Sequence, residues 1–95
     1  MFLVILYLDL PIWNYDGSST YQATGTNSDT YLHPVAIYKD PFRRGNNILV
    51  LCETFKFDGT PTASNKRNSC IEVVNKCEKE QPWFGIEQVH VFYFS

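Results

Sequence analysis

The stretch ILVLCETF, residues 48–55, carries the strongest strand pattern in the chain. Its even-numbered side chains would share one face of a sheet and its odd-numbered side chains the other, because side chains alternate along a strand. Asn46-Asn47 precedes it as a turn, and Asp58-Gly59-Thr60-Pro61 follows it with the composition of another turn. The pattern predicts one strand with a turn at each end.

A second strand is expected immediately upstream, over residues 31–38. Pro34 interrupts it, and proline cannot donate to a strand ladder, so Pro34 must lie at an edge or a bulge. Asp40-Pro41 begins a turn between the two stretches. We therefore expect adjacent antiparallel strands.

A helix is expected downstream of residues 48–55. Thr62 or Ser64 can cap it, and apolar residues at helical spacing continue to about Lys79. The apolar stripe is thin, which favours a helix lying on a sheet. Gln81-Pro82 ends the helix, and the aromatic, β-branched residues 83–94 predict a last strand.

The N-terminal third has two parts. Residues 2–8 form an apolar run of strand length that ends before Pro11, whereas residues 13–29 look like a long polar loop. Long loops in small domains tend to be functional. The order of elements predicts a single α+β domain over residues 1–95, a small mixed β-sheet with one helix packed on it.

Composition excludes several classes of function. Of 95 residues 44% are hydrophobic and the net charge is −2, so we expect a folded chain without a nucleic-acid-binding surface. The apolar run at the N-terminus is too short to span a membrane and lacks the features of a signal peptide. Three cysteines are typical of reduced thiols, and a small metal or redox protein is the weakest reading because no fourth ligand lies at useful spacing.

Two acidic residues are candidates for a site. Asp16 begins Asp-Gly-Ser-Ser in the long loop, where Ser18 and Ser19 could support its carboxylate, although Asp-Gly is also a common turn pair. Glu87 precedes the aromatic stretch, where it is either a metal-binding carboxylate or a solvent-facing strand residue. His33 and His90 form no ligand set at any defensible spacing.

Several separated motifs resemble those of one enzyme family. They are WNYDGSST at 13–20, NSD at 27–29, DPFR at 40–43, LVLCE at 49–53, NKR at 65–67 and PWFGIEQ at 82–88. In this order they resemble the N-terminal region of animal-type glutamine synthetases, over about residues 10–88. The resemblance implies a β-grasp domain of a cytoplasmic, ATP-dependent glutamate–ammonia ligase that serves glutamine biosynthesis.

The same resemblance implies roles for the loop. In this family glutamate is phosphorylated by ATP, and ammonia then displaces the phosphate. Asp16 would attract ammonium and help to remove its proton, while Ser18 and Ser19 shape the loop. The site would be completed by the catalytic domain of a neighbouring subunit in a ring.

Glu87 matches the first glutamate of the Glu-x-Glu strand that holds Mg²⁺ or Mn²⁺ in this family. Residues at i and i+2 of a strand share a face, so the spacing suits metal binding. Here the second position is Val89, which cannot bind a metal. We expect the 95-residue chain to be catalytically incomplete and to bind no cofactor by itself.

The match ends at both termini in apolar sequence. One hypothesis is that residues 1–7 and 89–95 are translated intron around a genuine exon. Another is that Val89 is a true substitution in a paralogue that has lost catalysis. A third is a non-catalytic β-grasp module that acts by packing against partner subunits.

Overall fold

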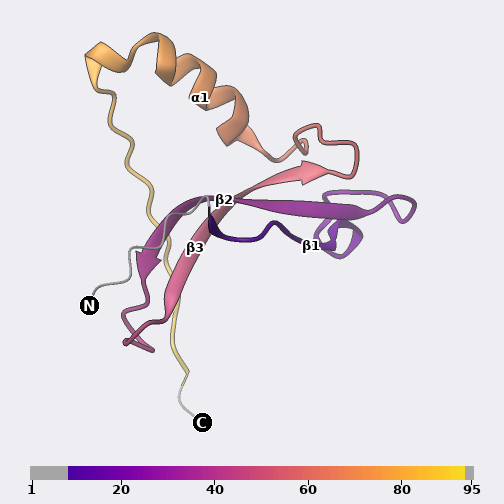
Figure 1. Ribbon diagram of the computed structural model, residues 1–95, viewed down its shortest axis with the longest axis horizontal. Coiled ribbons are helices and arrows are strands. Elements are labelled where there is room, and N and C mark those ends of the chain that lie inside the picture. The colour runs from indigo at the N-terminus through magenta and orange to yellow at the C-terminus, as the bar shows by residue number, and fades with distance from the viewer. Residues whose placement is uncertain (1–8, 94–95) are drawn as a thin grey trace.

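The computed structural model describes residues 9–93. Within this range three strands form one antiparallel sheet in the order β1-β2-β3 (Figure 1). The elements are β1 (Trp13–Asp16), the 3₁₀ helix η2 (Gly17–Thr20), β2 (Asp29–Lys39), β3 (Ile48–Lys56), the α-helix α1 (Lys66–Lys76) and the 3₁₀ helix η3 (Glu78–Glu80). The strand expected over residues 2–8 lies outside the described residues.

The hairpin of β2 and β3 confirms the central prediction. The strands expected at 31–38 and 48–55 are both present, and their register runs from Thr30 opposite Lys56 to Lys39 opposite Ile48. The register shifts between Pro34 and Ala36. Proline therefore occupies a bulge of the central strand, as its missing N–H requires.

The connection between β2 and β3 is organised by a carboxylate. Asp40 accepts hydrogen bonds from the backbone N–H groups of Phe42 at 2.8 Å and Arg43 at 3.0 Å. Arg44 and Gly45 then take positive φ angles of 57° and 58°, which reverse the chain. The Asp-Pro turn expected from the sequence is confirmed, with Asp40 as the residue that organises it.

The buried side chains in and beside the sheet are polar. Among residues 9–93 no hydrophobic side chain is buried, whereas Thr30, Asp40 and Thr62 are. The hydroxyl oxygens of Thr54 and Thr62 lie 2.6 Å apart in a hydrogen bond beside β3. Backbone ladders and short polar networks therefore hold the described sheet together, since it encloses no hydrophobic core.

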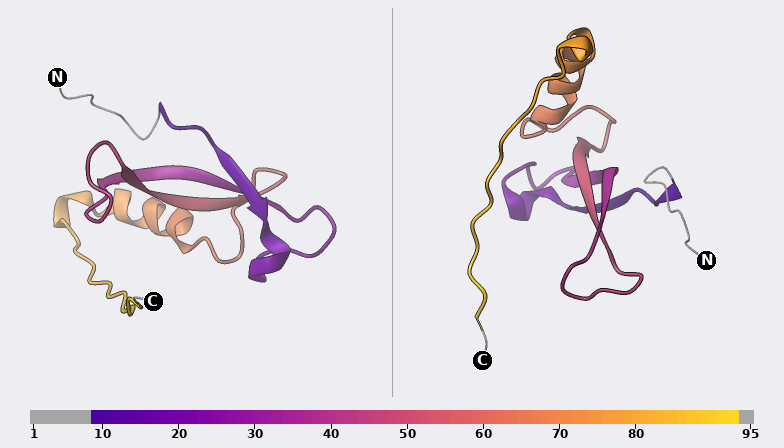
Figure 2. Two further views of the ribbon diagram at one scale, coloured as in Figure 1. Left: turned by 90° about the horizontal axis from the view of Figure 1, so that it is seen from below. Right: turned by 90° about the vertical axis from the view of Figure 1, so that its left-hand side faces the viewer.

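The helix begins later and ends earlier than the sequence predicted. Asn65 is its N-cap and accepts from the Asn68 N–H at 3.1 Å, so the prediction of Thr62 or Ser64 was wrong. Thr62 instead lies against β3, where its N–H donates to the Thr54 carbonyl at 3.2 Å and its hydroxyl is hydrogen-bonded to that of Thr54. No residue of α1 is buried, and the helix stands to one side of the sheet (Figures 1 and 2).

The strand predicted after the helix is not present among the described residues. Residues 83–93 form no regular structure, and Trp83 is 94% exposed. Aromatic and β-branched composition favours a strand only where a neighbouring edge supplies hydrogen bonds, and this segment pairs with none of the described strands. It runs past the sheet as the yellow trace of Figure 1, with the Phe92 ring centroid 5.2 Å from that of Phe42.

The architecture confirms the predicted fold class. Three strands and one helix make a small α+β, β-grasp-like unit. The described strands all pair antiparallel, whereas we had expected a mixed sheet. The strand predicted after the helix is the one that is missing from the described sheet, since residues 83–93 pair with none of its strands.

Candidate functional site

Asp16 is the last residue of β1 and lies at the edge of the sheet. β1 pairs with β2, with Trp13 opposite Leu32 and Asp16 opposite Asp29. The long loop expected over residues 13–29 thus begins with a strand and a 3₁₀ turn. Four residues are too few to show a strand period, which is why the sequence did not reveal β1.

The Asp16 carboxylate is exposed and hydrogen-bonded to its own turn. Its Oδ1 accepts from the Ser18 hydroxyl at 2.6 Å and from the Ser18 N–H at 2.9 Å. These bonds, with a further one from the Ser28 side chain, hold the pKa of Asp16 below its ordinary value. The side chain is therefore an anion at neutral pH, and it faces solvent.

Ser19 supports the turn from the other side. Its hydroxyl donates to the backbone carbonyl of Asp16 at 2.8 Å, and the Thr20 hydroxyl donates to the Gly17 carbonyl at 3.1 Å. The 3₁₀ helix η2 then ends at Tyr21, which adopts a left-handed conformation with φ 60°. The structure thus brings Asp16, Ser18 and Ser19 together in one turn, and their roles in catalysis stay a prediction.

Gly17 is a structural residue of this site that sequence reasoning missed. It is buried, and its N–H donates to the Ser28 carbonyl at 2.8 Å. A Cβ atom on Gly17 would lie 2.2 Å from Thr30 Oγ1, inside van der Waals contact. Only glycine fits here, so Gly17 fixes where the Asp16 turn sits on β2.

Gln22 joins the turn to the segment before α1, a second link that the sequence did not reveal. Its Oε1 accepts from the Tyr15 hydroxyl and, at 2.6 Å, from the Thr20 hydroxyl. Its Nε2 donates to Ser64 Oγ at 2.9 Å. The contact spans 42 residues of sequence, and no local pattern encodes such a pair.

Glu87 does not join Asp16. It is exposed in the irregular segment after η3, and this segment passes the opposite end of the sheet from η2 (Figure 1). Within residues 9–93 no three His, Cys, Asp or Glu side chains gather closely enough to hold a metal ion. One carboxylate with Val89 at the second position does not fit a Mg²⁺ or Mn²⁺ site.

The cysteines give no alternative site in the described part of the chain. Cys52, Cys70 and Cys77 are free thiols. Burial raises the pKa of the Cys52 thiol, which makes it less reactive at neutral pH. Neither observation favours the metal or redox reading of the sequence.

Sequence comparison identifies the family. The chain is 75% identical over 84 residues to glutamine synthetase 2 cytoplasmic of Drosophila melanogaster. The matched region covers 88% of this chain and 23% of that protein. The chain belongs to the glutamine synthetase family. It is also 59% identical over 80 residues to glutamine synthetase of Panulirus argus, covering 84% of this chain and 22% of the relative.

A third glutamine synthetase carries a different location in its name. Glutamine synthetase 1, mitochondrial, of Drosophila melanogaster is 59% identical over 81 residues, covering 84% of this chain and 20% of the relative. The chain thus spans less than a quarter of the curated relatives that it matches. No protein-family profile matches it. No helix within residues 9–93 has the length and apolar character that a bilayer crossing requires.

Proposed function

We propose that this chain is the N-terminal part of a glutamine synthetase, which makes glutamine from glutamate, ammonia and ATP, and that it supplies the acid of the ammonium site. The observation that carries the proposal is the Asp16 carboxylate, which is solvent-exposed, held by Ser18 and kept anionic at neutral pH. An anion in this position attracts NH₄⁺ by Coulomb forces and can accept its proton. Deprotonation releases the lone pair with which ammonia attacks.

Each residue of the turn has a distinct task in this proposal. Asp16 holds the cation and takes the proton. Ser18 orients the carboxylate and lowers the pKa of Asp16 through two hydrogen bonds, and Ser19 fixes the backbone carbonyl of Asp16. Gly17 sets the depth of the turn against Thr30.

The remaining parts of the reaction belong to the complete enzyme. Glutamate, ATP and Mg²⁺ or Mn²⁺ would bind in a catalytic domain, supplied by a neighbouring subunit of a ring. Glu87 alone makes no metal site, so we assign it no step beyond serving as one ligand once such a domain is present. The higher identity to the cytoplasmic than to the mitochondrial Drosophila relative, 75% against 59%, supports a cytoplasmic location.

The test compares the chain alone with a chimaera. The isolated 95-residue chain should give no glutamine above background with ATP, glutamate and ammonia. Residues 10–88, placed in the corresponding part of Drosophila glutamine synthetase 2, should support glutamine formation. Turnover by the isolated chain, or an inactive chimaera that still folds and assembles, would contradict the proposal.

The second candidate is an inactive paralogue, and Val89 favours it. Extending the chimaera by one residue, from Gln88 to Val89, tests it directly. If the chimaera with residues 10–89 is inactive and its Val89→Glu variant is active, Val89 alone abolishes catalysis. A protein that carries Val89 then acts as a packing module. If activity persists with Val89, this alternative is wrong.

A further inference from the structure

Gln22 holds the residues on both sides of Asp16 by hydrogen bonds. Its side-chain Oε1 accepts from the hydroxyl of Tyr15, the residue before Asp16. Its backbone N–H donates at 2.8 Å to the carbonyl of Gly17, the residue after Asp16. The backbone that carries the carboxylate is therefore held at both ends by a single residue.

The other end of the Gln22 side chain is tied to the sheet through a chain of hydroxyl groups. Its Nε2 donates to Ser64 Oγ at 2.9 Å, and Ser64 Oγ lies 3.2 Å from Thr62 Oγ1. The hydroxyl oxygens of Thr62 and Thr54 lie 2.6 Å apart, and Thr62 is buried. Since Thr54 belongs to β3, these bonds connect the turn after β1 to the strand at the opposite end of the sheet order.

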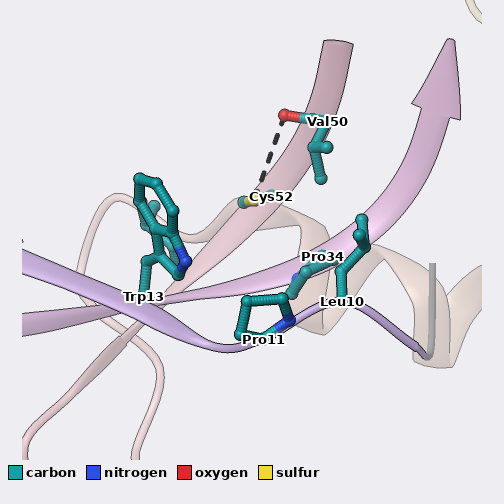
Figure 3. A pocket seen from close by; sticks show the side chains of 7 residues that line it. Leu10, Pro11, Trp13, Pro34, Val50 and Cys52 are labelled. Carbon is teal, nitrogen blue, oxygen red and sulfur yellow. Dashed lines mark hydrogen bonds between the residues drawn. The ribbon is translucent and has the colours of Figure 1, made fainter. Parts of the chain in front are cut away.

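This network lies on one face of the sheet, and the Asp16 carboxylate leaves β1 on the other. Side chains alternate along a strand, so Tyr15 shares its face with Trp13 and not with Asp16. On this face Trp13 and Cys52 border an apolar groove of about 290 Å³, whose lining residues are drawn in Figure 3. Thr54 follows Cys52 on the same face of β3 and leads from the groove to the network. The network therefore holds the backbone from behind and leaves the carboxylate exposed.

We propose that Gln22 is a positioning residue for ammonium capture, which acts on Asp16 through the Tyr15 hydroxyl and the Gly17 carbonyl. The inference rests on the proposed role of Asp16. A group that takes a proton must lie within hydrogen-bond reach of it, and a displacement of about 1 Å can lower the rate by about 10²-fold. Gly17 places the turn on β2, and Gln22 adds a second attachment, to the segment that is bound to β3.

The first test compares two nucleophiles in the chimaera that carries residues 10–88. Ammonium is a cation at pH 7 that must be held and deprotonated, whereas hydroxylamine is mostly neutral at this pH and needs neither step before it attacks. Gln22→Met keeps the length of the side chain and removes its hydrogen bonds. It should lower kcat/KM for ammonium by about tenfold or more and that for hydroxylamine by less than about threefold. Gln81→Met, the same change at an exposed position after η3, should alter neither.

A milder variant removes the tie to β3 and leaves Gln22 in place. Ser64→Ala should lower kcat/KM for ammonium by about threefold and leave that for hydroxylamine nearly unchanged. Ser69→Ala is the matched control, because the Ser69 hydroxyl bonds only within α1, to the Lys66 carbonyl. If Ser64→Ala behaves like this control, the tie does not position the turn and the proposal is wrong.

A double-mutant cycle separates positioning from a general loss of function. If Gln22 acts through the Asp16 carboxylate, Gln22→Met should cost less than about twofold in a chimaera that already carries Asp16→Asn. A tenfold loss in both backgrounds, or equal losses for the two nucleophiles, would overturn the proposal. If Asp16→Asn itself lowers the rates with both nucleophiles equally, the fault lies with the proposed role of Asp16.

Amide hydrogen exchange in the 95-residue chain tests the attachment without catalysis. In Gln22→Met the Gly17 N–H, which donates to the Ser28 carbonyl, should exchange about tenfold faster, because the turn opens more often. The Lys56 N–H, which donates to the Thr60 carbonyl at 2.7 Å, should keep its rate. Faster exchange at both amides would mean that Gln22 supports the whole fold, and an unchanged rate at Gly17 would mean that it does not hold the turn. Either result would overturn the proposal.

Discussion

The turns at Asp16 and Asp58 have the same internal bonding and different surroundings. Asp16 Oδ1 accepts from Ser18 N–H at 2.9 Å and from its hydroxyl at 2.6 Å. Asp58 Oδ1 accepts from Thr60 N–H at 3.0 Å and from its hydroxyl at 2.6 Å. In both turns these bonds hold the pKa of the carboxyl group below its ordinary value.

The turns differ in how they are anchored. Gly17 is buried against Thr30, and Gln22 links the Asp16 loop to Ser64. Gly59, by contrast, has open space where a Cβ would stand. The hydrogen-bonded turn orients the carboxylate and lowers its pKa, which any Asx turn can do, and the anchoring fixes where that carboxylate is held. Anchoring therefore separates a site from an ordinary turn.

The largest expected difference in stability comes from the two glycines. Gly17→Ala drives a methyl group into Thr30 Oγ1, so it should destabilise the chimaera by about 2–3 kcal/mol. Gly59→Ala meets no atoms, but its φ of +83° should cost about 1 kcal/mol. Urea unfolding of both variants measures the difference. Equal losses would show that Gly17 does not anchor the Asp16 turn.

A smaller effect is expected where the anchor meets α1. Asn65→Ala removes the N-cap of α1 and should cost about 1 kcal/mol. Ser69→Ala, within the helix and exposed, is the matched control and should cost a few tenths of a kcal/mol at most. Thermal unfolding distinguishes them. A control that costs as much as Asn65→Ala would mean that the cap is not specific.

The smallest effects concern pH, and here the two turns should behave alike. Each of these carboxyl groups has a lower pKa in the folded protein than in the unfolded protein, where the pKa is near 3.8. This difference stabilises the folded state at pH values above 3.8, and the stabilisation is lost as the pH falls through the lowered pKa. Ser18→Ala and Thr60→Val should each raise the pKa of the aspartate in their turn. Carbon-13 NMR titration of the carboxyl groups checks both. If the pKa rises for only one of the two aspartates, the two turns do not hold their carboxyl groups in the same way.

Sequence period predicted the two long strands well. Residues 48–55 and 31–38 alternate over enough positions to establish a strand, and Pro34 indicated its own bulge. β1 was missed because four residues show no period. The prediction of a strand over residues 83–94 was wrong for the described residues 83–93, because they pair with no edge of the described strands. Asn65 was missed as a cap because Thr62, Ser64 and Asn65 are all residue types that cap helices, and composition does not decide among them.

The candidate site was predictable in part. Family motifs drew attention to Asp16, Ser18 and Ser19, and the structure places them in one turn. The bonding pattern alone could not have selected Asp16, since Asp58-Gly59-Thr60 produces the same one. The roles of Gly17 and Gln22 depend on contacts between distant segments, which spacing along the chain does not encode.

The most direct measurement is kcat/KM for ammonium at pH 7 in the chimaera, for Asp16→Asn beside Asp58→Asn. Each substitution removes one negative charge from a turn of the same geometry. If Asp16 receives the ammonium proton, its variant should lose about 10²-fold or more, whereas the Asp58 variant should stay within about twofold. An Asp16→Asn chimaera as active as its Asp58→Asn counterpart would contradict the account.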